Sequence, residues 1–65
     1  MGEWKEYIIF CFGELVDCET ARSKKEACDY YVEKCRVKYI GDFGSEPTDD
    51  MIKNIYENID VSEGG

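Results

Sequence analysis

The chain has 65 residues, of which 43% are hydrophobic, and it carries a formal charge of −7 with no histidine. This length predicts a single domain with a thin core, because so short a chain buries only about 60% of its unfolded surface. Direct binding of nucleic acid needs surplus Lys and Arg to neutralise phosphates, so the composition argues against it and favours basic partners.

The first ten residues, MGEWKEYIIF, contain neither a basic n-region nor a long apolar run. We therefore expect no signal peptide, no membrane span and a cytoplasmic location. In a reducing cytosol free thiols are the default. Burial of the cysteines as small apolar residues is favoured over disulfides between sheet and helix, and over a metal site, because six-residue gaps do not resemble zinc knuckles. The residues concerned are Cys11, Cys18, Cys28 and Cys35.

Residues 7–12, YIIFCF, predict a strand because they are β-branched and aromatic. Gly13-Glu14 fits a two-residue type II′ turn, whose first position favours glycine. That turn pairs Phe12 with Leu15 and predicts an edge strand after it. One face of the hairpin would then carry Ile9, Cys11, Val16 and Cys18. The other would carry Ile8, Phe10, Phe12 and Leu15, with the acids Asp17 and Glu19 beyond them, pointing outward.

SKKEACDYYVEKC opens with a capping box between Ser23 and Glu26, and its apolar residues recur at helical spacing. We expect a helix over 24–36. The stretch 37–43, VKYIGDF, is open to two interpretations: it continues the helical stripe, with Gly41 as a C-terminal cap, or it forms a strand. We prefer the strand, because a central first strand needs a second neighbour. The last helix begins at PTDD, with acids in its first turn, and extends to about residue 59.

The predicted fold class is therefore α+β, with the order β-β-α-β-α and a small antiparallel sheet in the order 2-1-3. Residues 1–62 would form a single domain and residues 63–65 a frayed tail. The first helix would cover one face of the central strand. The last helix, or another molecule, would cover the other face.

Catalysis is not expected, and neither are a cofactor or a metal ion. A cysteine nucleophile would have no histidine base to activate it. Paired carboxylates need a cleft, for which so thin a domain has little room. No Gly-rich phosphate loop is present, and DFG at 42–44 stands without the other kinase elements.

Acidic residues supply the functional signal. Residues 6–21 and 39–52 each contain four acids and no base. One interpretation is solubility, helix capping and protection of an edge strand. The other is electrostatic mimicry, in which carboxylates occupy Arg and Lys sites that evolved for phosphates. Exposed aromatic anchors would be drawn from Trp4, Tyr30, Phe43 and Tyr56. The predicted partner-binding residues are Glu14, Asp17, Glu19, Asp42, Glu46, Asp49 and Asp50.

The whole-chain pattern of short length, surplus acid and a hairpin followed by an S-x-x-E-A helix, here SKKEA at 23–27, resembles the small acidic proteins of phages and mobile elements, among them anti-CRISPR proteins. The resemblance implies stoichiometric inhibition of a nucleic-acid-binding host complex, and it assigns no residue a role. Two alternatives remain: a homodimer formed through the Ile8–Phe10–Phe12–Leu15 face, and a cysteine-based redox or metal module.

Overall fold

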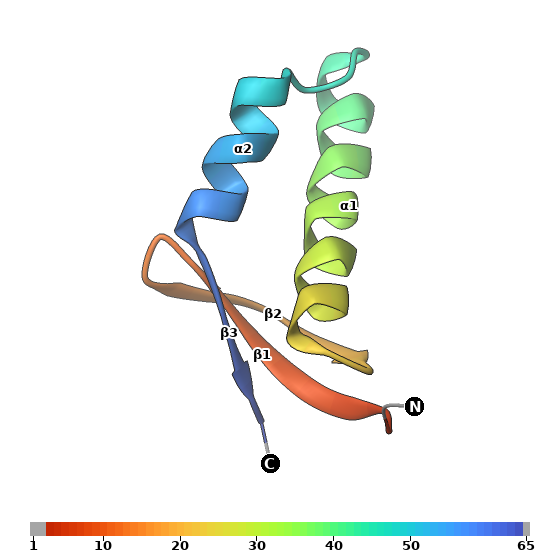
Figure 1. The fold of residues 1–65 in the computed structure, drawn as a ribbon. Coiled ribbons are helices and arrows are strands. Elements are labelled where there is room, and N and C mark those ends of the chain that lie inside the picture. Colours follow the sequence, from red (N-terminus) through yellow and green to blue (C-terminus); the bar gives the residue numbers. More distant parts are fainter. Residues whose placement is uncertain (1–2, 65) are drawn as a thin grey trace.

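The computed structural model describes residues 3–64 and has the α+β fold that the sequence predicts, with three antiparallel strands and two helices. The sheet order, β2-β1-β3, also agrees with the prediction. Both helices lie on the same side of the sheet and project beyond it (Figure 1). The elements are β1 (Lys5–Cys11), β2 (Glu14–Ala21), α1 (Lys24–Phe43), α2 (Asp49–Asn58) and β3 (Ile59–Glu63).

The third strand lies elsewhere in the chain than we expected. Residues 37–43 belong to α1, so the preferred strand interpretation is wrong; the helical alternative is correct, except that Gly44 and not Gly41 is the C-terminal cap. The helix passes through Gly41 and ends before Gly44, whose φ of 72° is left-handed and whose N–H donates to the Ile40 carbonyl at 2.8 Å. The second neighbour of β1 is β3, which directly follows α2, and the observed order is β-β-α-α-β.

The hairpin turn also differs from the prediction. Cys11 pairs with Glu14, so the two central residues are Phe12 and Gly13, with φ of 54° and 79°. Positive φ at both positions is the signature of a type I′ turn, which suits the twist of the strands. The N–H of Phe12 donates to the Asn58 carbonyl at 3.1 Å, and this bond ties the turn to the junction between α2 and β3.

A bulge in β2 exchanges the faces that we predicted for most of that strand. Phe10 pairs with Leu15 and Ile9 pairs with Asp17, which leaves Val16 without a partner in the register. Beyond Val16 the pairing differs by one residue from the prediction, and a shift of one residue turns every side chain to the opposite face. Asp17 and Glu19 therefore lie on the helix side of the sheet, whereas Cys18 lies on the open side.

The core lies between the sheet and the first half of α1. Ile9 is fully buried, and Tyr7, Ala21 and Ala27 pack with it. The half-buried side chains of Tyr31, Ile59 and Val61 complete this cluster. Ser23 caps α1 as predicted, since its Oγ accepts from the Glu26 N–H at 3.1 Å.

Residues beyond 62 are part of the sheet, contrary to the predicted frayed tail. Strand β3 runs through Glu63, and the N–H of Gly64 donates to the Glu6 carbonyl at 2.8 Å. Gly65 lies outside the described residues.

Candidate functional site

Two of the predicted partner-binding acids are engaged inside the fold. Asp17 and Glu19 face α1, where the ammonium group of Lys34 lies 3.1 Å from Asp17 Oδ2 and also contacts the Glu19 carboxylate. Their side chains are only 25% and 12% exposed. Lys34, which lies 17 positions after Asp17, therefore shares one positive charge between two carboxylates, and both acids are engaged within the fold.

The two carboxyl groups also interact with each other. Their mutual hydrogen bond is the main cause that lowers the pKa of Asp17. The same bond is the main cause that raises the pKa of Glu19, and desolvation by burial is the second cause. The Asp17–Glu19–Lys34 cluster is thus a structural feature of the sheet–helix interface.

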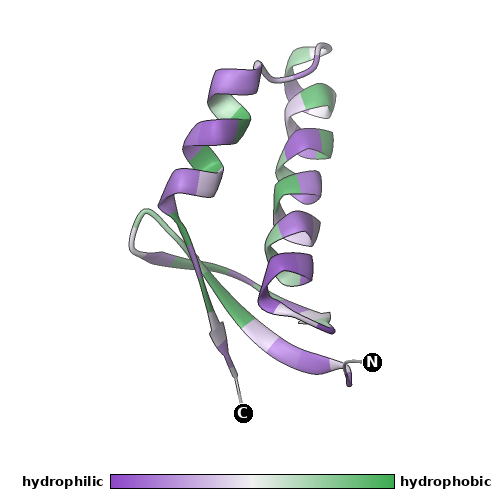
Figure 2. Cartoon of the chain, viewed as in Figure 1, coloured by the Kyte–Doolittle hydropathy of each residue, from purple (hydrophilic) through white to green (hydrophobic). Residues whose placement is uncertain are grey.

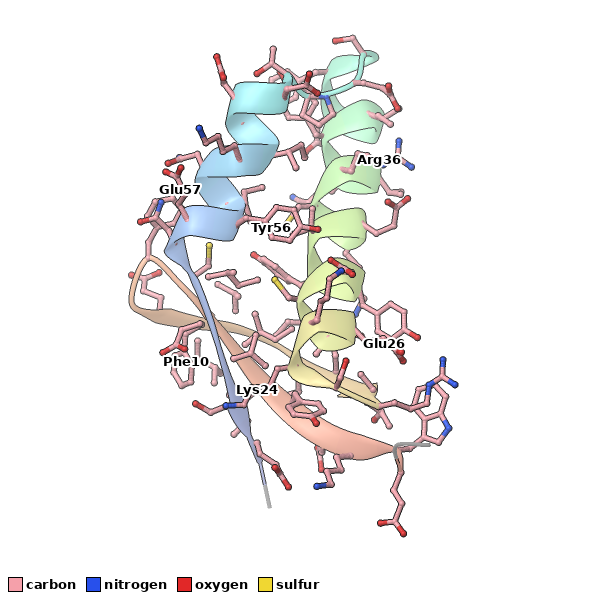
Figure 3. All side chains as sticks on the ribbon, viewed as in Figure 1. Phe10, Lys24, Glu26, Arg36, Tyr56 and Glu57 are labelled. Carbon is pink, nitrogen blue, oxygen red and sulfur yellow. The ribbon has the colours of Figure 1, made fainter. Side chains whose placement is uncertain are left out.

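Acids of the second predicted cluster are partly neutralised as well. Glu46 lies 2.6 Å from Nη1 of Arg36, and Asp42 lies 3.7 Å from Nζ of Lys38. Both bases come from α1. Residues 39–52, which contain no base in the sequence, therefore have bases beside their acids in the folded chain. Figure 3 labels Arg36 on α1, beside the loop that joins the helices.

Three of the predicted acids have no basic partner among the described residues. Asp49 and Asp50 occupy the first turn of α2, behind the capping residue Thr48, whose Oγ1 accepts from the Met51 N–H at 3.3 Å. Carboxylates in the first turn of a helix interact favourably with the positive end of the helix dipole, so these two residues stabilise α2. Glu14 is exposed beside the hairpin turn. The hairpin and the loop between the helices lie far apart in a molecule 36 Å long (Figure 1), so the seven acids do not form one surface.

Ion pairing uses nearly all of the bases. Within residues 3–64, every Lys and Arg except Lys24 lies within 4.0 Å of a carboxylate. Six acids of the described chain have no such basic partner, and they are Glu3, Glu6, Glu14, Asp49, Asp50 and Asp60. These six residues therefore carry most of the excess negative charge.

The aromatic residues that we predicted as anchors each have a partner within the chain. The guanidinium of Arg22 lies 5.2 Å from the centre of the Trp4 ring, and the rings of Tyr39 and Phe43 are 4.5 Å apart. The tyrosine hydroxyls donate to carboxylates: Tyr30 to Glu26 at 2.9 Å and Tyr56 to Asp29 at 2.8 Å.

The side of the sheet that faces away from the helices is called here the open face. The sequence predicted this surface only in part. The pairing Ile8 with Cys18 and Phe10 with Leu15 places these four side chains on it. Leu15 is 62% exposed and Cys18 is exposed, and Phe10 is labelled on this side in Figure 3. The alternation of β1 predicted its apolar part. The open face comprises Glu6, Ile8, Phe10, Leu15, Cys18, Thr20, Asp60 and Ser62.

All four cysteines are free thiols, and they differ in burial. Cys11 is buried, Cys28 and Cys35 are half-buried, and Cys18 is exposed, so our expectation that Cys18 is buried and shares a face with Ile9 and Cys11 is wrong. Burial raises the pKa of Cys11 and of Cys28, which keeps these two thiols protonated near neutral pH. Within residues 3–64 the structure groups no three side chains of the His, Cys, Asp or Glu type for a metal ion.

A shallow hollow on the outer side of α2 is lined by Asp50, Met51, Lys53, Asn54 and Glu57 and is open to solvent. No helix of the described part of the chain is both long and apolar enough to span a bilayer. Comparison with protein-family models, with curated proteins and with solved structures gives no match to this chain.

Proposed function

We propose that this chain is a non-enzymatic inhibitor that binds a basic protein of a nucleic-acid-binding complex and keeps nucleic acid from it. The observation that carries this proposal is the set of six carboxylates that have no basic partner within residues 3–64. The ion pairs of the fold engage all but one of the bases, so the remaining acids do not balance charges inside the molecule.

Uncompensated negative charge on a small rigid domain favours association with a positive surface. Such a field speeds encounter and makes the affinity fall as salt is added. Nucleic acids and anionic membranes are repelled by the same field. A site that binds phosphates presents the complementary charge, which is why a nucleic-acid-binding protein is the partner class that we propose.

Competition against nucleic acid tests the proposal. A panel of purified DNA- and RNA-binding proteins is assayed for binding to this chain, with and without saturating nucleic acid, over a range of salt concentrations. We expect at least one member to bind at a one-to-one ratio, to lose affinity as salt rises, and to release this chain when nucleic acid is added. Binding that nucleic acid and salt leave unchanged would contradict the proposal.

Self-association is the second candidate, because no helix packs on the apolar part of the open face. A symmetric pair of open faces, however, would bring Glu6 and Asp60 of one copy against the acids of the other, and each copy carries a charge of −7. Like charges at an interface oppose association. Sedimentation equilibrium at tens of micromolar distinguishes the candidates: a monomer is expected, and a dimer would support self-association.

A further inference from the structure

The open face and the turn at its end have the composition of a docking surface. Ile8 and Phe10 lie at the centre, on the middle strand, and Leu15 lies beside Phe10. Helix α1 packs on the opposite side of the sheet and α2 packs against α1 (Figure 1), so neither helix covers the open face, where Ile8 and Phe10 are half-buried within the sheet and Leu15 is 62% exposed. Figure 2 shows hydrophobic residues in the middle part of β1 and in the hairpin.

Phe12 adds a second observation. Its φ of 54° is left-handed, a conformation that is unfavourable for a bulky residue and that Asn or Gly adopts readily. The side chain is 62% exposed, so the fold gains little from the ring. An aromatic residue held at a strained and exposed position points to a function other than stability.

Charge defines the chemistry of the partner. Glu6 and Asp60 flank the apolar centre on β1 and β3, and Glu14 stands beside the turn. None of these three acids has a basic partner among residues 3–64, and no open-face position carries Lys or Arg. Among the exposed apolar side chains elsewhere in the described chain, Val37 and Phe43 lie on α1, whose sequence places Arg36 and Lys38 beside Val37.

We propose that the open face, together with Phe12, is the surface on which the basic partner docks, and that the partner presents Lys or Arg side chains around an apolar centre. This inference rests on the proposed function and deepens it. It moves the binding site away from Asp17, Glu19, Asp42 and Glu46, which are engaged within the fold, and onto acids that surround an uncovered apolar strip. Such an arrangement combines apolar anchors with a charged rim, as protein interfaces do.

The test uses the intact chain and a short amphipathic helical peptide of leucine and lysine, labelled with a fluorophore, with a leucine–glutamate peptide as control. Binding is followed by fluorescence anisotropy. The location of binding is followed by the rate at which iodoacetamide alkylates Cys18, which is exposed on the open face, against the rate for Cys28. The two peptides share their apolar face, so the comparison isolates charge.

Matched variants then locate the site. Leu15→Ser removes an apolar side chain from the open face, and Val37→Ser removes one of similar exposure, 57%, from α1. One double variant, Glu6→Gln with Asp60→Asn, removes the two carboxylates that flank the apolar centre of the open face. The matched double variant, Asp49→Asn with Asp50→Asn, removes two carboxylates from α2. Circular dichroism establishes that each variant is folded, so a lost affinity reports on contact with the peptide.

We expect the leucine–lysine peptide to bind, to slow alkylation of Cys18 but not of Cys28, and to lose about tenfold in affinity with Leu15→Ser but less than about twofold with Val37→Ser. The rim pair should weaken binding more than the α2 pair does. Binding that leaves Cys18 unprotected, or that the α1 and α2 variants weaken equally, overturns this docking surface and leaves the proposed function standing. Failure of the leucine–lysine peptide to bind, or equal binding of both peptides, overturns the proposed function and this inference with it.

Discussion

Tyr56 and Asp29 connect the two helices. The hydroxyl of Tyr56, on α2, donates a hydrogen bond of 2.8 Å to Oδ1 of Asp29, on α1, across 27 positions of sequence. Asp29 also binds Lys25 at 3.1 Å, so the carboxylate is oriented from both sides. No residue of α2 is fully buried, so we expect this bond to contribute to holding α2 in place. Figure 3 shows Tyr56 directed from α2 toward α1.

Tyr56→Phe should therefore destabilise the domain, by about 1 kcal/mol, because it removes a partly exposed hydrogen bond to a charged group. In a domain of this size that change corresponds to a fall in Tm of about 4–8 °C. The control is Tyr30→Phe, which removes a bond to Glu26 within α1 alone. Thermal unfolding followed by circular dichroism measures both. Equal effects of the two variants would contradict a special role for the link between the helices.

Alkaline pH should weaken the same link. Burial, and then the hydrogen bond to Asp29, raises the pKa of Tyr56 from 10.0 to about 12. The folded state retains the Tyr56 proton where the unfolded chain has lost it. The stability that this group contributes is therefore complete below pH 10 and is lost as pH rises toward 12. Urea midpoints across this range should fall more steeply for the unmodified chain than for Tyr56→Phe, and parallel curves would count against this assignment.

Gly44 and Gly41 should respond to alanine with opposite signs. Gly44 has a φ of 72°, so Gly44→Ala should cost about 1 kcal/mol or more. Gly41 lies within α1, and a Cβ atom there meets no atom within 4 Å, so Gly41→Ala should stabilise the helix by about 0.5–1 kcal/mol. Urea unfolding gives both values, and a stabilising Gly44→Ala would refute the cap geometry.

The two sides of β1 should differ in their sensitivity to truncation. Ile9 is fully buried, whereas Ile8 is half-exposed on the open face. Ile9→Val should cost about 0.5–1.5 kcal/mol, and Ile8→Val should cost less, because only the first leaves a space in the core. Chemical denaturation at equal protein concentration makes the comparison. An equal loss for Ile8→Val would mean that the open face is covered in solution.

Phe12→Asn should stabilise the hairpin while it weakens docking. Asn-Gly is the sequence best suited to a type I′ turn, so the substitution should relieve about 1 kcal/mol of backbone strain. The affinity for the leucine–lysine peptide should fall, because the exposed ring is lost. Unfolding and anisotropy measurements on the same sample test both effects. A variant that is more stable and binds equally well would show that Phe12 has no part in docking.

Much of the fold could be predicted from the sequence, and the errors have identifiable causes. The hairpin, the Ser23 cap and the need for a second neighbour of β1 all follow from local chemistry. The misplaced strand arose because Val37, Tyr39 and Ile40 suit either structure, and packing against α2 is not visible in a local pattern. A weak signal for β3 was present, since Ile59 and Val61 alternate with Asp60 and Ser62 after the helix.

The candidate site was less predictable, because charge that is contiguous in sequence need not be contiguous in space. Lys34 reaches Asp17 and Glu19 from another element, and Arg36 does the same for Glu46. The bulge at Val16 determines which side of the sheet Asp17 and Glu19 occupy, and no feature of the sequence predicted this bulge. The apolar half of the open face could be predicted from β1, whereas its acidic rim also needs Asp60, which lies on β3.

Strand β3 follows α2 directly and is the last element of the described chain, so we expect it to join the fold last. Strand β3 pairs with β1 across about fifty positions of sequence, whereas the hairpin and the start of α1 are neighbours in the chain. Contacts between distant segments form late, because a long loop must close first. During synthesis the hairpin and α1 would form first, and the acidic rim, which begins with Glu6 on β1, would be completed only when β3 brings Asp60 beside Phe10.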